Sequence, residues 1–397
     1  MCTRKKILYL TFYFGPDLCA GSFRNTPLVE ELAKQAKDNA TIDVITTVPN
    51  RYRSFEIDAP SFEKRDNYTV TRITIPKHES GIKDQIFSFQ KYYRQVLQIV
   101  GKRKYDLVVA SSSRLFTAYL GYSVAKRMNA KLYLDIRDIF YDTLDDLLKG
   151  VVVRRLVLPL IKSLERRTFG YASHINLISE GFKPYFSSYT KARFSYYPNA
   201  IDDIFIRAND EEDYFQQSTI PSAPKTIVYA GNIGEGQGLH KIVPQVASAL
   251  GGEFKFVIIG DGGAKKKLVD KIDEMKLDNV ELRSPVQRDQ LIDVYKNADF
   301  LFVHLNNFKA FEKVLPSKLF ELATFPKPII AGVGGFAAEF VRKNIDNCLL
   351  FEPCNVKDLL YKLDHYSYKQ IRRSDFINKF ERGTINKAMS STILTTI

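Results

Sequence analysis

Cysteine and histidine are scarce in this sequence, and neither forms a recognisable metal site. The cysteines stand apart without a CxxC pair, and the five histidines do not cluster. A structural zinc ion needs Cys or His ligands at close, regular spacing, and disulfide-rich chains belong to oxidising compartments. We therefore expect a protein of a reducing compartment without a structural zinc site. The four cysteines are Cys2, Cys19, Cys348 and Cys354.

Long apolar runs are also missing. No segment reaches the roughly 18–20 apolar residues of a membrane-spanning helix. The first apolar run, Ile7–Phe14, is too short for a signal-peptide core followed by a cleavage site, and we interpret it as a buried strand. The expected location is the cytoplasm, where the chain is either free or bound peripherally to the inner face of the cell membrane.

The excess positive charge is confined to one half of the chain. The 397 residues are 45% apolar, which indicates a globular protein long enough for two domains. The net charge is +13; residues 1–200 hold 32 Lys and Arg against 19 Asp and Glu, whereas residues 201–397 hold 26 of each sign. This asymmetry suggests that the first half meets an anionic bilayer, a polyanion or a phosphorylated acceptor. A solvated basic surface without a partner is the alternative.

Apolar runs alternate with amphipathic stretches through both halves, which is typical of parallel, doubly wound sheets. The acidic, proline-containing stretch 209–224 is the best linker candidate. We predict an α/β protein of two Rossmann-like domains, 1–200 and 201–397, which face each other across a cleft. The last helix, at about 366–397, is expected to pack back on the first domain. Ligands of such folds bind at the carboxyl ends of the strands.

The elements expected in the first half are the strands Lys6–Phe12, Thr41–Thr46, Thr69–Ile75, Leu107–Ala110, Lys131–Ile136, His174–Leu177 and Phe194–Tyr197, and the helices Pro27–Lys37, Lys83–Lys102, Leu115–Met128 and Arg154–Phe169. Those expected in the second half are the strands Thr226–Tyr229, Lys255–Ile259, Asn279–Leu282, Phe300–His304, Pro328–Ala331 and Cys348–Phe351.

Two helical segments of the first half are both amphipathic and basic. They are Lys83–Lys104 and Gly150–Arg167. Each can lie on an anionic bilayer with its apolar face down and its cations at the headgroups. The alternative is a helix that covers the sheet and carries its basic residues on the solvated face.

Glycine-containing loops follow several predicted strands. The first strand leads into Gly15–Arg24, where Gly21 precedes a helix, and the second half has similar loops at Tyr229–Leu239 and Gly260–Gly263, followed by Ser284–Val286 after the next strand. Glycine lets a backbone approach a phosphate or a sugar closely. The first loop does not fit GxGxxG, so a nicotinamide cofactor is not favoured. Because the loops fall on the same sheet edges, we predict a nucleotide pocket; unrelated tight turns are the alternative.

The segment that ends in Pro316–Glu321 predicts a phosphate-binding helix tip. Pro316 and Ser317 can start a helix. Lys318 then lies in the first turn, where free N–H groups and the positive end of the helix dipole attract anions. Glu321 follows one turn later on the same side, where its carboxylate can hold a ribose. An ordinary capped helix is the alternative.

In this order and spacing, the motifs resemble family 4 of the glycosyltransferases, which are retaining enzymes of the GT-B fold. The chain is most similar to the bacterial branch that builds O-antigen and capsule repeat units, including N-acetylfucosamine-type transferases. The similarity spans nearly the whole chain. The segments that carry it are Gly15–Arg24, Leu134–Asp138, Leu164–Arg167, Tyr197–Ala200, Tyr229–Leu239, Ile259–Gly262 and Pro316–Glu321.

The resemblance implies a donor site built from the loops and the helix tip. It also implies catalysis without a metal, because N–H groups and cationic side chains bear the leaving-group charge; the sequence contains no DxD motif. The implied contacts are Gly21, Gly231, Asn232 and Gln237 for the diphosphate and sugar, Asp261 and Val286 for the base, Ser317, Lys318 and Leu319 for the phosphates, and Glu321 for the ribose.

The chain departs from the family pattern at several of these positions. Members often carry a glutamate that contacts the donor sugar where Lys313 stands, with Glu312 one residue away, so we expect these two to be possible sugar contacts. Members also often carry Arg and Lys at the positions of Asn232 and Gln237. The usual sugar and phosphate contacts are therefore reassigned in this chain.

Three side chains are the catalytic candidates: Arg137, Asp138 and Lys318. Arg137 stands where the family often has a histidine, and with Lys318 and Lys313 it is expected to replace the missing cations. Asp138 or Asp135 would orient the acceptor or act on its hydroxyl proton. For both carboxylates, the alternative is a buried structural role.

The sequence therefore predicts a retaining hexosyltransferase that moves a sugar from a nucleotide sugar, UDP-linked in our expectation. The acceptor would be a polyprenyl-diphosphate-linked or other glycan in the synthesis of lipopolysaccharide O-antigen or capsule, at an anionic membrane surface. No cofactor, metal or nucleic acid is expected. The alternatives are a GT-B nucleotide-sugar epimerase and a non-catalytic nucleotide-sugar-binding scaffold.

Overall fold

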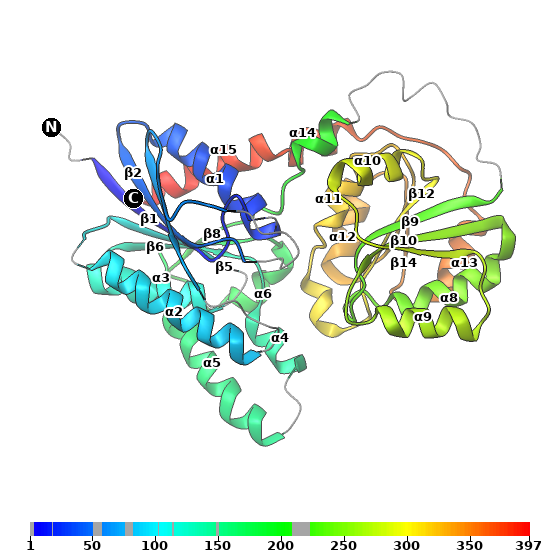
Figure 1. Cartoon of the computed structure of the whole chain (residues 1–397), viewed down its shortest axis with the longest axis horizontal. Coiled ribbons are helices and arrows are strands. Elements are labelled where there is room, and N and C mark those ends of the chain that lie inside the picture. Colours follow the sequence, from blue (N-terminus) through cyan, green and yellow to red (C-terminus); the bar gives the residue numbers. More distant parts are fainter. Residues whose placement is uncertain are drawn as a thin grey trace. The chain divides into compact units, whose positions relative to one another are not determined.

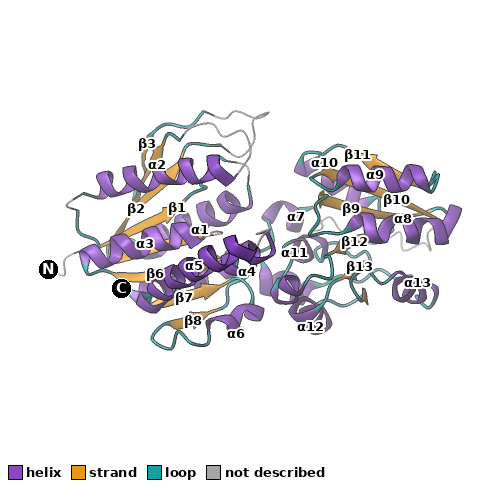
Figure 2. Ribbon diagram, turned by 90° about the horizontal axis from the view of Figure 1, so that it is seen from below, coloured by secondary structure: helices purple, strands orange, loops and turns teal. Residues whose placement is uncertain are grey.

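The chain folds into two compact units. The computed structural model describes residues 4–17, 19–50, 58–75, 82–101, 103–112, 115–147, 151–208 and 223–397. The N-terminal unit is Met1–Asn199 together with Gly383–Ile397, and the C-terminal unit is Ala200–Arg382 (Figure 1). Each unit is a Rossmann-like layer structure with helices on both faces of a sheet (Figure 2). Some residues of the predicted motifs and segments lie outside the described residues; they are Cys2, Leu18, Lys102, Gly150 and most of the linker at 209–224.

The sheet of the N-terminal unit has eight strands within the described residues, in the order β3-β4-β2-β1-β5-β6-β7-β8. All neighbours are parallel except β3 and β4. Strands buried on both faces read as continuous apolar runs, as in β1. The strands are β1 Lys5–Thr11, β2 Ala40–Thr47, β3 Phe62–Lys64, β4 Tyr68–Ile73, β5 Leu107–Ser112, β6 Lys131–Ile136, β7 His174–Leu177 and β8 Arg193–Ser195.

Helices cover both faces of this sheet. The helices α1 and α15 share an apolar core with one face, while α2, α3 and α5 lie over the other (Figures 1 and 2). The helices are α1 Ala20–Ala36, α2 Ile82–Val100, α3 Leu115–Met128, α4 Phe140–Leu147, α5 Val151–Tyr171, α6 Lys183–Phe186 and α15 Arg382–Thr396, with the 3₁₀ turn η1 Glu180–Phe182.

The sheet of the C-terminal unit has six parallel strands within the described residues, in the order β11-β10-β9-β12-β13-β14. An apolar core joins α8, α9 and α13 to one face. The strands are β9 Lys225–Asn232, β10 Phe254–Asp261, β11 Val280–Arg283, β12 Phe300–His304, β13 Ile329–Gly332 and β14 Cys348–Phe351. The helices are α7 Asp203–Arg207, α8 Leu239–Leu250, α9 Lys265–Glu274, α10 Arg288–Lys296, α11 Lys318–Leu322, α12 Gly335–Asn344, α13 Val356–Asp364 and α14 Ser374–Phe380, with the 3₁₀ turns η3 Gly251–Glu253 and η4 Lys309–Lys313.

The last residues of the chain are shared between the two units, and the return to the N-terminal unit begins later in the chain than the sequence suggested. Residues 366–382 belong to the C-terminal unit, and the N-terminal unit takes up only Gly383–Ile397. The reason lies in α14, where Phe376 and Phe380 pack against Phe320 and Phe340 of the same unit. No helix in the described residues is both long and apolar enough to span a membrane.

Candidate functional site

The predicted glycine loops meet at the carboxyl edge of the C-terminal sheet. The ends of β9 and β10 are in register, with Gly231 opposite Gly260 and Asn232 opposite Asp261. Gly260 has φ +151°, and a Cβ there would lie 1.9 Å from the Gly231 carbonyl oxygen. Only glycine allows these two backbones to come so close, so main chain without side chains lines this edge where the two loops begin.

The loop after β9 is held in place from below by two buried polar residues. Asn306 donates to the carbonyl of Glu235 at 2.8 Å and accepts from Lys241 at 3.0 Å. His304, at the end of β12, lies 2.6 Å from the Gln237 carbonyl through Nδ1 and accepts from the Cys354 N–H at 3.0 Å through Nε2. Neither residue was predicted from the sequence as part of the site.

His304 is a neutral bridge between two loops. Burial lowers its pKa to about 4, so the ring is uncharged at neutral pH. Since Nε2 accepts a hydrogen bond, the proton sits on Nδ1 and is donated to Gln237. A polar residue at the carboxyl end of a buried strand is the sequence signal that could have identified it.

Lys318 and Glu321 form the charged part of the site. Lys318 Nζ lies 2.7 Å from Glu321 Oε1, and the two side chains are 28% and 20% exposed. Tyr295, which is fully buried, donates to the same Oε1 at 3.1 Å. A Cβ on Gly231 would lie 3.6 Å from Lys318 Cε, so the ion pair borders the first glycine loop. These are the residues that the sequence predicted to converge.

The helix that carries this pair is shorter than the sequence suggested. The helix α11 spans five residues, and the amides of Leu319 and Phe320 already donate to the carbonyls of Pro316 and Ser317. Leu319 is fully buried, while Ser317 is exposed and its side chain makes no capping bond. So short a helix has little dipole, and the Lys318 ammonium is therefore the main positive charge here.

The remaining predicted donor residues lie around this edge. Asn232 donates to Gln237 Oε1 at 2.8 Å, so these two side chains form one unit. Asp261 accepts from the Gly262 amide at 2.8 Å and is largely exposed. Val286 is 37% exposed in the loop between β11 and α10.

The two candidate sugar contacts lie in η4. Glu312 is exposed, whereas Lys313 is half-buried. The backbone of Glu312 is fixed against α12, because a Cβ on Gly335 would lie 2.2 Å from its carbonyl oxygen. The main chain of this turn therefore packs closely against the start of α12.

In the N-terminal unit, Gly21 and Arg137 come together. A Cβ on Gly21 would lie 3.3 Å from Arg137 Nη1. Within the described residues, Arg137 Nε is buried without a hydrogen-bond partner. Burial and the charge of Arg24 lower the pKa of Arg137 from its usual value. A guanidinium whose Nε lacks a partner, beside the start of α1, suits an anion.

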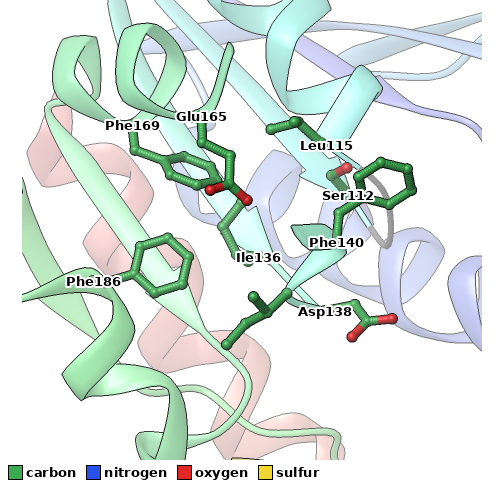
Figure 3. Close-up of a pocket in the computed structure, with 9 residues that line it drawn as sticks. Ser112, Leu115, Ile136, Asp138, Phe140, Glu165, Phe169 and Phe186 are labelled. Carbon is green, nitrogen blue, oxygen red and sulfur yellow. The ribbon is translucent and has the colours of Figure 1, made fainter. Parts of the chain in front are cut away.

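Asp138 lies at the rim of a small pocket formed by the ends of β5 and β6 with α3, α4, α5 and α6 (Figure 3). The cavity measures about 10 Å³, roughly the space of one water molecule. Figure 3 shows the Glu165 carboxyl directed toward the pocket and that of Asp138 away from Phe169 and Phe186. Desolvation raises the pKa of both carboxyls, although the Asp138 residue as a whole remains exposed.

Asp135 has the buried structural role that was the alternative to a catalytic one. Its carboxylate is fully buried and pairs with Arg24 through two contacts of 2.9 Å. Ser111 and Asn176 each donate to it at 2.8 Å. Burial alone would raise the pKa of Asp135, but the charge and hydrogen bonds of Arg24 outweigh it and lower that pKa. A buried carboxylate whose oxygens are already paired in this way is not available to an acceptor hydroxyl.

No group of three or more His, Cys, Asp or Glu side chains in the described residues is placed to hold a metal ion.

Comparisons with known proteins find similar glycosyltransferases. Residues 210–382 match the family model described as Glycosyl transferases group 1. WcaI of Escherichia coli K12, named for colanic acid biosynthesis as a glycosyl transferase, is 24% identical over 336 residues, which cover 79% of this chain and 80% of that protein.

Solved structures show the same architecture. The lipopolysaccharide outer core galactosyltransferase WaaB, in its apo form, covers 99% of this chain and 100% of its own, with a TM-score of 0.62 at 15% identity. Anabaena HepE, in a complex with UDP and glucose, has the same coverage and identity, with a TM-score of 0.63. The predicted resemblance and the GT-B fold are therefore confirmed.

Proposed function

We propose that this chain, a glycosyltransferase of the GT-B fold by these matches, transfers a sugar from a UDP-sugar to a polyprenyl-diphosphate-linked glycan in bacterial surface polysaccharide synthesis. The anomeric configuration would be retained. The observation that carries the proposal is the Lys318–Glu321 pair beside Gly231, at the edge where the glycine loops meet. It offers one cation for a diphosphate and one carboxylate for a sugar diol.

The comparisons support the substrate classes. HepE was solved with UDP and glucose, and WaaB is a galactosyltransferase of the lipopolysaccharide outer core. WcaI is named for the biosynthesis of colanic acid. The HepE complex supports a UDP-linked donor, whereas the names of WaaB and WcaI support a role in surface polysaccharide synthesis.

In the C-terminal unit, Lys318 would neutralise the departing diphosphate and Glu321 would bind the ribose. The main chain at Gly231 and the Asn232–Gln237 unit would face the diphosphate and sugar, as their place on the strand edge suggests. The base would lie near Asp261 and Val286. Glu312 and Lys313 remain the candidates for the sugar ring.

In the N-terminal unit, Gly21 and Arg137 would meet a phosphate group, and Asp138 would orient the acceptor hydroxyl or take its proton. The raised pKa of Asp138 suits a proton acceptor at the surface of a pocket. We propose that these cations stabilise the leaving group without a divalent ion.

We also propose that the N-terminal unit binds an anionic membrane through α5. Leu156 and Leu160 are 67% and 66% exposed and lie one turn apart. Arg155, Arg166 and Arg167 are exposed on the same helix. An apolar stripe flanked by cations fits the headgroup region of an acidic bilayer, where a lipid-linked acceptor would be presented.

The donor site is tested by Lys318→Ala and Glu321→Ala. Each should weaken UDP binding and lower kcat/KM about 10- to 100-fold, since a charged hydrogen bond is lost. The matched control is Lys271→Ala or Glu274→Ala, which breaks an exposed ion pair of the same i, i+3 spacing on α9 and should change neither. Activity should persist in EDTA.

Wild-type turnover in both site variants would refute the donor site. UDP binding without turnover of any UDP-sugar would instead favour the scaffold alternative. Loss of activity in EDTA with rescue by a divalent ion would refute the metal-free mechanism alone.

A further inference from the structure

Tyr295 lies beneath the Lys318–Glu321 pair, and no sequence motif predicts a role for it in the site. It belongs to α10, is fully buried, and packs edge-on against Phe325 with the ring centroids 5.2 Å apart. Its hydroxyl donates to Glu321 Oε1 at 3.1 Å and accepts from Lys318 Nζ at 3.4 Å. A phenylalanine would fill the same space, so the hydroxyl group is the feature that requires a function.

The hydroxyl is a permanent donor. Burial, and next the charge of Glu321, raise the pKa of Tyr295 well above its usual value. The proton therefore stays on the oxygen at any working pH and is always available to Glu321. The hydrogen bonds run in series from Lys318 through Tyr295 to Glu321. They polarise one another, which strengthens each of them.

These contacts leave one side of the carboxylate open. Within the described residues, the hydrogen bonds to the Glu321 carboxylate, from Lys318 and from Tyr295, both end on Oε1. A partly exposed glutamate without such anchors would sample several rotamers. Anchoring Oε1 from a buried, rigid ring fixes the direction of Oε2.

We propose that Tyr295 is a positioning residue that holds the Glu321 carboxylate in the geometry needed to bind the ribose diol of the nucleotide donor. This inference rests on the donor site proposed above and adds a residue that does not touch the ligand. Its effect should be restricted to ligands that carry the ribose 2′- and 3′-hydroxyls.

The experiment compares UDP with 2′,3′-dideoxy-UDP on Tyr295→Phe by isothermal titration calorimetry. Tyr295→Phe should weaken UDP about 5- to 10-fold, the loss expected for one hydrogen bond to a charged group that acts indirectly. Its affinity for the dideoxy ligand should equal that of the wild type. The control is Tyr366→Phe, which removes a hydroxyl bonded to Asn347 in the same unit and should leave the affinity for both ligands unchanged.

A double-mutant cycle separates positioning from general loosening. In a Glu321→Ala background, Tyr295→Phe should cause no further loss of UDP affinity, because the two changes remove the same contact. Equal losses for both ligands, or additive losses in the cycle, would overturn the positioning role while leaving the donor site intact. Failure of the wild type to bind UDP would overturn both.

Discussion

At the scale of single residues, Gly260 has the tightest backbone environment of the site. Its φ of +151° disfavours other residues, and a Cβ would lie 1.9 Å from the carbonyl oxygen of Gly231. Gly260→Ala should therefore lower the free energy of unfolding by roughly 2–4 kcal/mol through strain and displacement of β9. Urea unfolding of the purified variants measures this difference.

Gly263 is the matched control in the same loop. A Cβ there would meet no atom within 4 Å, so Gly263→Ala should change stability by no more than about 0.5 kcal/mol. Equal stabilities of the two variants would show that the close approach of β9 and β10 does not constrain this edge.

The charged residues of the site could be predicted from the sequence, but the partners of the residues that support them could not. Lys318 and Glu321 follow a proline at helical spacing, and that local pattern predicted a common face, which their ion pair confirms. Tyr295 and His304 act through partners that are 23 and 67 residues away in the chain. In the sequence each is one more buried residue of an amphipathic helix or an apolar strand.

At the scale of elements, the strands were predicted more closely than the helix ends. Strands such as β6 and β12 coincide with the predicted ranges because parallel, buried strands are continuous apolar runs. The edge strand β3 was missed, since it is three residues long and largely exposed. The start of α1 at Ala20, before Pro27, and the brevity of α11 depend on turns that periodicity does not show.

The helix α5 carries a prediction of its own. Leu156→Glu combined with Leu160→Glu should reduce flotation of the protein with phosphatidylglycerol vesicles about 10-fold or more, since two leucines no longer enter the apolar boundary. Both side chains are more than half exposed, so thermal stability should be unchanged. Binding should also weaken in about 0.5 M salt, where charges are screened.

The control for α5 is Tyr361→Glu, which changes a 60% exposed side chain of the C-terminal unit. It should not affect flotation. If the double leucine variant floats like the wild type, α5 is not the docking element; if the wild type does not float even at low salt, membrane binding itself is refuted.

At the scale of the whole molecule, the alternation of strands and helices was sufficient to predict two Rossmann-like halves. The point at which the chain returns to the N-terminal unit could not be predicted in this way. It depends on which of the two cores the last helices pack against. Phe376 fits the aromatic cluster around Phe320, whereas Met389 and Ile393 enter the core formed by α1 and the N-terminal sheet. Composition alone does not distinguish these two destinations.

The return of α15 makes the N-terminal unit depend on the far end of the chain. Met389 and Ile393 are at most 1% exposed, and Thr392 is 2.7 Å from the hydroxyl of Tyr197. A chain that ends at Arg382 should lose protection from hydrogen exchange in α1 and β1, because removing buried Met and Ile side chains costs about 2–5 kcal/mol each. Exchange in β9 and β10, which belong to the other unit, should not change. Adding the peptide 383–397 should restore protection in α1, whereas full protection of α1 in the truncated chain without the peptide would show that α15 is dispensable to that core.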